Sequence, residues 1–481
     1  MVADGTFFVT LNRMTTDITL DNITALAKRR GFIYPSSEIY GGLANTYDFG
    51  PYGTELKENV RRLWWDRFVR GREDMYGIDS SIIINPSVWE ASGHVAAFGD
   101  VMVEDTKTRK RYRADHIIED FADSAKDLSD EEREMLRKVD GKTADELQQI
   151  IEKYTIKSPD GNSFTPARKF NLLFETKIGI VEGDKSQAYL RGEIAQGLFI
   201  NYPNIIDSMH PRLPFGIAQA GKAFRNEITK GQFTFRTLEF DLMEFEYFFD
   251  PEEDWNSLFE YWKEEIHAFA LSTGLREENL RWRPHEDFEL SHYSKRTEDL
   301  EYKFPWGYKE MFACAYRTDF DLRNHAEHSG KDISYRTQEG RKFIPHVIEP
   351  TFGLSRLITI LMMDAYREEE VNGKKRTVLA FAPRIAPVKA AIFPLQKDEQ
   401  LHKLARDIYT DLSDSFSVEY ENKGNIGKMY RRHDEVGTPF CITVDFDSLT
   451  DKSVTVRNRD TMQQERMPIE KLKGFITQMT A

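Results

Sequence analysis

The chain has 481 residues, 40% hydrophobic and 30% charged, which is the composition of a globular protein long enough for two or three domains. The net charge of −14 argues against indiscriminate nucleic-acid binding, although a local basic patch can still bind one structured RNA. No run of about 18 apolar residues is present, so no membrane span is expected. The two cysteines, Cys314 and Cys441, are too few for a disulfide framework and fit buried packing in a reducing cytosol.

The N-terminal part combines an expected leader with two helices and a strand. Residues 1–20 lack the basic-then-apolar pattern of a signal peptide, so we expect a flexible leader. Apolar residues at helical spacing predict a helix over Asp21–Arg30 and a longer one from about Tyr52 to Val69. The apolar run Ser81–Asn85, which ends before a proline, predicts a strand.

Residues 105–165 differ in composition from the segments around them. Asp123–Lys153 is rich in charge, and its apolar residues recur at helical spacing. We therefore expect a helical module inserted into a larger domain.

Two neighbouring segments in the middle of the chain carry a set of side chains that suits a nucleotide. Arg225 and Glu227 are two residues apart, so on a strand they share one face, and Gly231 allows the chain to turn back. On the returning strand Arg236, Phe240 and Glu244 also share a face. Arginine suits phosphate, glutamate suits the adenine amino group, and phenylalanine can stack on the base.

A second signal for phosphate binding lies downstream. Pro350–Arg356 reads as a strand that feeds the apolar helix Leu357–Met363, with Gly353 and Arg356 at the helix start. A helix N-terminus beside an arginine makes an anion site. The alternative for both signals is an amphipathic core hairpin and a buried helix with arginines on the surface.

The last hundred or so residues predict a separate small domain. The polar segment 366–378 is expected to be a linker. After it, strands at 389–395, 417–420 and 440–445 alternate with helices, which favours an α/β unit with a mostly parallel sheet. Lys423, Lys428, Arg431 and Arg432 surround Tyr430, a pattern that suits phosphates and an unpaired base, or simply a solvated face.

The two middle segments resemble motifs two and three of the class II aminoacyl-tRNA synthetases, and the helix and strand over 52–86 resemble motif one, the dimer interface of that family. The resemblance implies an α+β fold with three parts. They are a catalytic domain over 21–375 built on an antiparallel sheet, its helical insertion at about 105–165, and an α/β anticodon-binding domain over 380–481.

Seven further segments are similar to those of the dimeric glycyl-tRNA synthetases: Tyr47–Gly53, Trp89–His94, Tyr112–Asp115, Phe215–Ile217, Arg317–Leu322, Val347–Pro350 and Arg432–Phe440. The resemblance implies a cytoplasmic homodimer that forms glycyl-adenylate from glycine and ATP and transfers the glycyl group to the 3′ end of tRNA(Gly). Two alternatives are an inactive, nucleic-acid-binding accessory subunit and a synthetase for alanine or serine.

For ATP, the resemblance implies Arg225 at the α-phosphate, Glu227 at the adenine amino group, Phe240 under adenine, and Arg236 and Arg356 at the γ-phosphate. Arg225 and Arg356 are the expected catalytic residues. The full expected ATP-binding set is Arg225, Asn226, Glu227, Phe235, Arg236, Phe240, Glu310, Met311, Gly353 and Arg356. Mg²⁺ is expected to arrive with the nucleotide, where Glu310 can touch it.

For glycine, the resemblance implies that Glu193 and Glu349, with the Thr351 hydroxyl, hold the ammonium group. The full expected glycine-binding set is Arg113, Glu193, Phe240, Glu244, Arg317, Glu349 and Thr351. Because glycine has no side chain, larger amino acids must be excluded sterically. The expected tRNA contacts are Lys428, Arg431 and Arg432.

The sequence also departs from the family pattern. Gly192 and Ile194 flank Glu193 where the family has proline and threonine, Leu242 replaces an amide, Thr351 replaces a serine, and Tyr308 and Lys309 change a Gly-Trp-Gly-Glu turn. Many bacterial relatives bind zinc through cysteine pairs in the insertion. The corresponding turns here, 105–108 and 158–161, have no cysteine, so no structural zinc and no other resident metal are expected.

Overall fold

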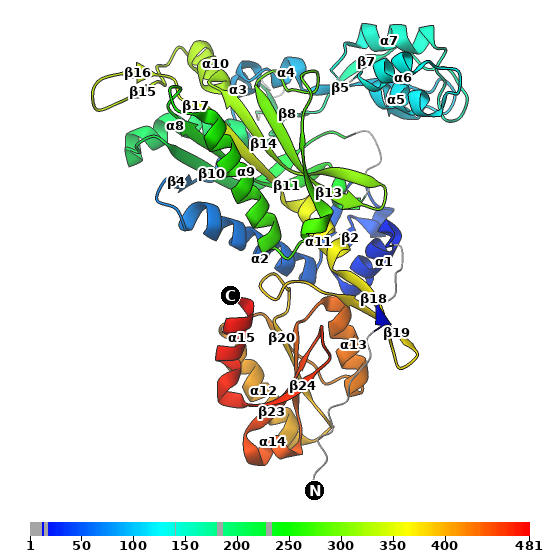
Figure 1. Ribbon diagram of the computed structural model, residues 1–481, viewed down its shortest axis with the longest axis vertical. Helices are drawn as coiled ribbons and strands as arrows, with labels where there is room; N and C mark the ends of the chain where they lie inside the picture. The colour runs from blue at the N-terminus through cyan, green and yellow to red at the C-terminus, as the bar shows by residue number, and fades with distance from the viewer. Residues whose placement is uncertain (1–11, 14–17, 140, 180–185, 228–232) are drawn as a thin grey trace.

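The computed structural model describes residues 12–13, 18–139, 141–179, 186–227 and 233–481. Figure 1 shows three parts: a central unit built around a large sheet, a small helical module at one end (cyan), and a C-terminal α/β unit at the other (orange to red). Most of the expected leader and Gly231 lie outside the described residues. Within the described part of the chain, no helix is long and apolar enough to cross a membrane.

The described part of the central unit contains a seven-stranded sheet in the order β12-β13-β14-β17-β11-β10-β4. Its strands are β4 (Met75–Gly77), β10 (Phe215–Phe224), β11 (Glu239–Phe249), β12 (Leu280–Pro284), β13 (Arg296–Phe304), β14 (Gly307–Thr318) and β17 (His346–Gly353). Neighbours run antiparallel except β4 and β10. The predicted antiparallel core is therefore confirmed.

Alternation along β11 decides which face of the sheet is the core. Met243, Phe245, Tyr247 and Phe249 point into the main hydrophobic core, while the residues between them point the other way. Three helices cover the core face: α2 (Pro51–Trp65), α9 (Trp255–Ser272) and α11 (Leu354–Ala365). On the opposite face, α8 (Ala195–Met209) packs on one end of the sheet through a smaller hydrophobic cluster that includes Phe248, and polar side chains such as Glu244 and Glu246 occupy the middle of β11.

The prediction of a strand over 81–85 is wrong. Within this segment the structure has only an isolated bridge between Ile83 and Leu190, and the strand that joins the sheet is β4. Because β10 already pairs with β4 and β11, it has no free edge for the later segment. Ile82 and Ile83 are left 38% and 46% exposed.

The helical module has its own core and its own sheet. Helices α5 (Ala114–Ser124), α6 (Asp130–Arg137) and α7 (Ala144–Lys153) pack beside the strands β6 (Arg111–Arg113), β5 (Gly99–Glu104) and β7 (Arg168–Asn171). Capping boxes at Ser129 and Thr143 explain where α6 and α7 begin. The helices expected in this region are confirmed.

A carboxylate joins the two turns where the family resemblance places zinc-binding cysteines. Asp105 is fully buried and accepts hydrogen bonds from the backbone N–H groups of Lys107 and Thr108 (both 2.8 Å), the Ser158 hydroxyl and the Asn162 amide (3.1 Å). Burial opposes ionisation of Asp105, but the four donors outweigh it and hold its pKa well below the usual range. Asp105 thus fastens both turns with hydrogen bonds.

Changing Asp105→Asn is expected to loosen the helical module, because an amide places N–H groups against donors. Its melting temperature should fall by about 5 °C or more, and hydrogen exchange should speed up in both turns. Asp160→Asn, an exposed carboxylate paired with Lys110, is the matched control. An Asp105→Asn variant with the melting temperature and hydrogen exchange of wild type would contradict this role. So would a wild-type protein that is destabilised by a zinc chelator.

The C-terminal unit is the predicted small α/β fold. Its sheet has the order β21-β20-β22-β23-β24, in which β20 pairs parallel with β21 and β22, and β23 pairs antiparallel with β22 and β24. The strands are β20 (Ala390–Pro394), β21 (Val418–Tyr420), β22 (Phe440–Val444), β23 (Ser453–Asn458) and β24 (Gln464–Pro468), and the helices are α12 (Glu399–Ser413), α13 (Ile426–Val436), α14 (Phe446–Asp451) and α15 (Leu472–Thr480).

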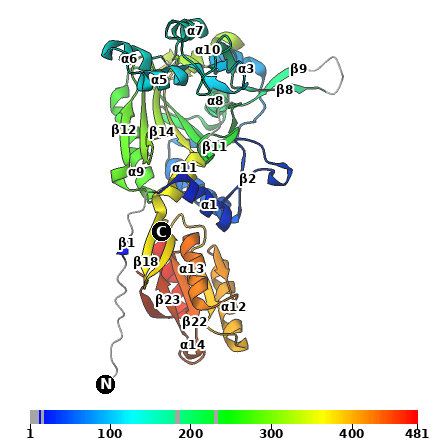
Figure 2. The same ribbon diagram turned by 90° about the vertical axis from the view of Figure 1, so that its right-hand side faces the viewer.

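The segment expected to be a linker is a hairpin instead. Strands β18 (Tyr366–Val371) and β19 (Lys374–Leu379) pair antiparallel, and Figure 2 shows β18 running from the central unit to the C-terminal one. Arg376 is buried and pairs with Glu369 and with Asp434 of α13. Some of the charges that made this segment look like a linker, above all Arg376 and Glu369, are paired in the interior.

The remaining elements are β1 (Asn12–Arg13), which pairs with β18, and α1 (Leu20–Arg30), β2 (Ile33–Pro35), β3 (Tyr47–Phe49), α3 (Pro86–Ala91), α4 (His94–Ala97), β8 (Phe174–Ile178), β9 (Ser186–Leu190), α8 (Ala195–Met209), α10 (Phe320–Ser329), β15 (Tyr335–Arg336) and β16 (Lys342–Phe343), with short 3-10 or π turns between them.

Candidate active site

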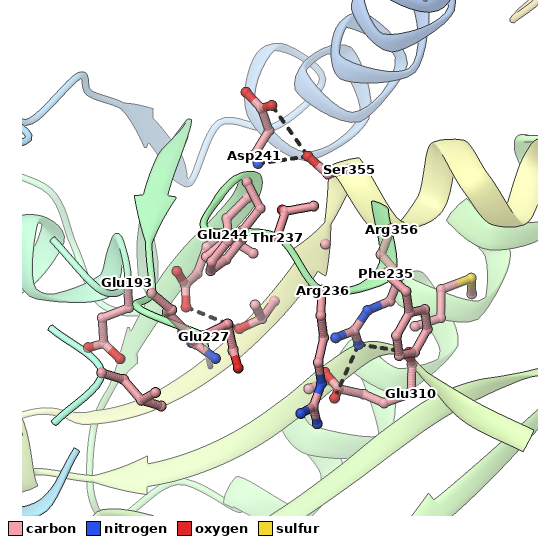
Figure 3. A pocket seen from close by; sticks show the side chains of 18 of the residues that line it. Glu193, Glu227, Phe235, Arg236, Thr237, Asp241, Glu244, Glu310, Ser355 and Arg356 are labelled. Carbon is pink, nitrogen blue, oxygen red and sulfur yellow. Dashed lines mark hydrogen bonds and ion pairs between the residues drawn. The ribbon is translucent and has the colours of Figure 1, made fainter. Parts of the chain in front are cut away.

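A cavity of about 400 Å³ lies on the face of the central sheet opposite the main core. Strands β11, β14 and β17 and the start of α11 supply much of its wall. The sequence-predicted residues that line it are Arg113, Glu193, Arg225, Glu227, Phe235, Arg236, Phe240, Glu244, Glu310, Met311, Glu349, Thr351, Gly353 and Arg356. In Figure 3, Glu193 lies toward one end, and Phe235, Glu310 and Arg356 lie toward the other.

Two predicted residues do not line this cavity. Asn226 donates its backbone N–H to the Leu172 carbonyl (2.8 Å), beside the wall. Arg317 is 1% exposed and lies behind the acidic end, where it holds other side chains. Arg317 is therefore not placed to contact a substrate directly.

Arg225 and Glu227 are not on a strand, contrary to the prediction. The pairing of β10 with β11 ends at Phe224 and Glu239, so both residues follow the end of β10, and Arg236 precedes β11. They reach the cavity from connecting segments. Only Phe240 and Glu244 share the predicted strand face.

Aromatic rings and a carbonyl position the Arg225 guanidinium. It lies 5.2 Å from the ring centre of Phe98 and 5.3 Å from that of Phe240. Its Nε donates to the Gly192 carbonyl at 3.1 Å. A guanidinium between rings is oriented without being neutralised, which suits contact with an anion.

Arg356 occupies the first turn of α11, directly after β17, as predicted. Its guanidinium lies over the Phe235 ring at 4.3 Å, and one nitrogen is 3.2 Å from a Glu310 carboxylate oxygen. The two arginine–aromatic pairs, Arg356 with Phe235 and Arg225 with Phe240, offer flat surfaces for a base and positive charge for phosphates.

The acidic end is organised by hydrogen bonds. The Thr351 hydroxyl donates to Glu244 (3.1 Å), and Arg317 donates to Glu349 (2.8 Å) and to both oxygens of Asp321 (2.8 and 2.9 Å). The predicted shared direction of Glu349 and Thr351 is confirmed, since both line the cavity from β17.

His94 holds Glu193 in place. Its Nε2 is 3.0 Å from one carboxylate oxygen, and Gln196 donates to the other at 3.0 Å. Burial opposes ionisation of Glu193, but His94 and Arg317 outweigh it and hold its pKa well below the usual range. Glu193 is thus an anion facing the cavity.

Sequence reasoning missed residues in the wall, such as Asp100 and Tyr293, and residues behind it, such as His94 and Asp321. His94 and Asp321 lie inside two segments that carry the resemblance, but no spacing rule pointed to them. Asp100, 3.2 Å from Arg113, and Tyr293, whose ring lies 3.8 Å from the Arg317 guanidinium, gave no signal. They come from distant parts of the chain and meet only in the folded protein.

The departure at Leu242 is accommodated by packing. Leu242 lies among Ile194, Ala223 and Phe240 in a small apolar cluster at the cavity wall. An apolar side chain in this place leaves no buried amide unpaired.

The expected tRNA contacts lie on α13 but differ in exposure. Lys428 is exposed, whereas Arg431 and Arg432 are half-buried and Arg432 pairs with Glu421. Tyr430 packs its ring against Phe393, and its hydroxyl bonds to Thr443 (2.7 Å). These contacts hold the Tyr430 ring against the C-terminal sheet, which leaves it less available for stacking on a base.

Comparisons with known proteins agree with this geometry. The family model for an anticodon binding domain matches residues 389–479. A prolyl-tRNA synthetase from Cryptosporidium parvum has a similar fold, with a TM-score of 0.61 at 14% identity over 99% of this chain and 78% of that one. The chain is 47% identical to the glycine–tRNA ligase of Caldanaerobacter subterraneus subsp. tengcongensis (96% of this chain, 99% of the relative) and 49% identical to that of Bacillus thuringiensis subsp. konkukian (95% and 98%). With such identity over nearly the whole length, the chain belongs to the glycine–tRNA ligase family.

Proposed function

We propose that this chain is a class II glycine–tRNA ligase that works in the cytosol. A glycine carboxylate oxygen attacks the α-phosphorus of ATP. The bond between the α-phosphorus and the oxygen that bridges to the β-phosphate breaks, and pyrophosphate leaves. A terminal ribose hydroxyl of tRNA(Gly) then takes the glycyl group, and AMP leaves. The observation that carries this proposal is one cavity with cationic and aromatic groups toward one end and carboxylates toward the other.

Positioning and charge account for most of the catalysis in such a reaction. We assign Arg225 to the α-phosphate and the glycine carboxylate, where negative charge builds up. Arg236 and Arg356 bind the γ-phosphate, Glu227 accepts from the adenine amino group, and Phe240 stacks on the base. The Arg356–Phe235 pair provides a second aromatic surface at the same end.

Mg²⁺ enters with the nucleotide in this proposal. The Glu310 carboxylate lines the cavity and is half exposed, so its oxygens suit a hard cation bound largely by phosphates and water. The ammonium of glycine is placed among Glu193, Glu244 and Glu349, with Thr351 orienting Glu244. Arg113 borders the same cavity from the helical module.

A homodimer and tRNA contacts through Lys428, Arg431 and Arg432 complete the proposal. The exposed Ile82 and Ile83 follow α2 at the surface, where a second copy can cover them. The exposed Lys428 is the best placed of the three basic residues for a phosphate. The accessory-subunit alternative is not favoured, because Arg225, Glu227 and Arg356 all line one cavity.

Amino-acid-dependent ATP–pyrophosphate exchange tests this function directly. With purified protein, exchange is expected with glycine and to be at least about a hundredfold weaker with alanine or serine, since one extra carbon must be excluded sterically. Exchange with alanine or serine would overturn the glycine assignment. No exchange with any amino acid, even with tRNA added, would favour the accessory subunit.

A further inference from the structure

Two carboxyl groups of β11, Glu244 and Glu246, are buried side by side at the acidic end. They are 2% and 0% exposed. One carboxyl oxygen of each of them and one of Glu349 all lie within 4.8 Å of one another. Among the described residues, one oxygen of Glu244 and both oxygens of Glu246 have no hydrogen-bond partner. Only Glu244 lines the cavity, so Glu246 lies behind it.

The surrounding charges do not neutralise this pair. The groups that face it are Glu349 on β17, Glu193 ahead of α8, Asp321 on α10 and Arg317 on β14, with His94 of α4 and Tyr293 behind them. Arg317 is committed to Asp321 and Glu349, and His94 to Glu193. Arg191 also faces Glu244, but it donates its hydrogen bonds to the Lys222 carbonyl and to Ser80. Among the described residues, no ion pair therefore reaches Glu244 or Glu246.

Two ionised carboxylates this close in a buried site repel each other strongly, and one of them holds a proton instead. Burial first, and then the charge of Glu349, raise the pKa of both Glu244 and Glu246 well above the usual range. A proton on this pair also gives a donor to oxygens that otherwise have none.

We propose that Glu244 and Glu246 share a proton while the pocket is free, and that the ammonium group of glycine displaces it. The inference rests on the proposed function. The carboxyl O–H bond breaks, the proton passes to solvent, and an ammonium N–H donates to the Glu244 carboxylate that remains. Glu246 is a positioning residue, which acts on glycine through Glu244.

Displacement of a proton makes glycine binding depend on pH with a definite sign. If one proton leaves for each glycine bound, affinity rises about tenfold per pH unit wherever the free pair is protonated. A pocket whose carboxylates were already ionised would bind glycine equally well across the neutral range. The two arrangements are therefore distinguishable near pH 7.

Calorimetry counts the released proton directly. Glycine is titrated into the full chain at pH 7 with α,β-methylene ATP present, in phosphate and in Tris, whose protonation heats differ. The difference between the binding heats in the two buffers is expected to correspond to about one proton released. Glycine affinity is expected to rise about tenfold per pH unit between pH 6 and 8. Equal heats in the two buffers would overturn the proposal, whatever any variant does.

Glu246→Gln tests which residue is responsible. Glutamine is neutral and has no titrating proton, so it removes the charge through which Glu246 adds to the effects of burial and Glu349 on the pKa of Glu244. Less than one proton should then be released at pH 7, and the rise of glycine affinity should shift to lower pH. Glu470→Gln, an exposed carboxylate of the C-terminal unit, should keep the wild-type value. A folded Glu246→Gln protein that still releases a full proton would refute the role of Glu246.

Exchange measured on the same preparation separates this inference from the function. Normal glycine-dependent exchange, together with equal heats of glycine binding in phosphate and in Tris, would refute only the proton displacement. Loss of exchange with every amino acid would refute both.

Discussion

Replacing Arg225 by alanine is expected to lower glycine-dependent ATP–pyrophosphate exchange by about a thousandfold or more. One well-placed donor at a developing negative charge is worth roughly 10²–10³ in rate, and Arg225 brings a full charge and two donor directions. The Phe98 and Phe240 rings both contact its guanidinium, which lines the cavity. The loss should appear mainly in the maximal rate, because the contact strengthens as charge builds up.

Two companion variants sharpen this test. Arg225→Lys keeps the charge but loses the planar fork, so it should recover only a small part of the rate. Arg137→Ala removes an exposed arginine of the helical module and should leave exchange unchanged. Unfolding should resemble wild type in all three, because within the described part of the chain the Arg225 guanidinium is held by a hydrogen bond to one carbonyl and by two ring contacts, and Arg137 is exposed. Near-normal exchange by a folded Arg225→Ala protein would rule out the central assignment.

The elements with strong periodic patterns were predictable from the sequence. The helices α1, α2 and α12 and the step from β17 into α11 lie where the apolar spacing placed them. Asp398 caps α12 by accepting from the N–H groups of the next turn. Local physical chemistry decides such elements.

The predictions of a strand over 81–85 and of a linker over 366–378 were wrong for the same reason. Composition does not show which segments and side chains pair in the folded protein. The segment 81–85 has strand-forming residues, but β10 offers it no free edge. The β18–β19 hairpin is rich in charge, yet Arg376 and Glu369 pair with each other in the interior. In both cases tertiary pairing overrode the local pattern.

Much of the wall of the site was predictable and the layer behind it was not. Residues such as Glu193 and Arg356 stand in recognisable motifs, and they line the cavity. The partners that set their charge lie far away in sequence, as His94 lies from Glu193. Arg317 was expected to touch glycine, but it lies behind Glu349 and reaches the pocket only through it.

Replacing Arg317 by methionine is expected to cost about 3–5 kcal/mol of unfolding free energy, since it removes the cation from a buried charge network. Arg317 is 1% exposed and neutralises Asp321 and Glu349. Without it, those carboxylates stay buried next to Glu246. Urea unfolding measures the loss. Arg323→Met, which breaks an i,i+4 pair between Asp319 and the exposed Arg323, should cost about 1 kcal/mol or less.

The pH dependence of the Arg317→Met variant identifies the cause. Carboxyl groups whose pKa is raised in the folded state bind more protons there than in the unfolded chain, so stability falls as pH rises. The pKa of Glu246 is already raised, and losing Arg317 removes the positive charge that limits this rise. The deficit relative to wild type should therefore grow from pH 5 to pH 8. Adding Asp321→Asn should recover part of the stability, because it removes one unpaired charge, but not glycine activation, because Glu349 still lacks its partner. A deficit independent of pH would instead point to lost packing around the Arg317 side chain.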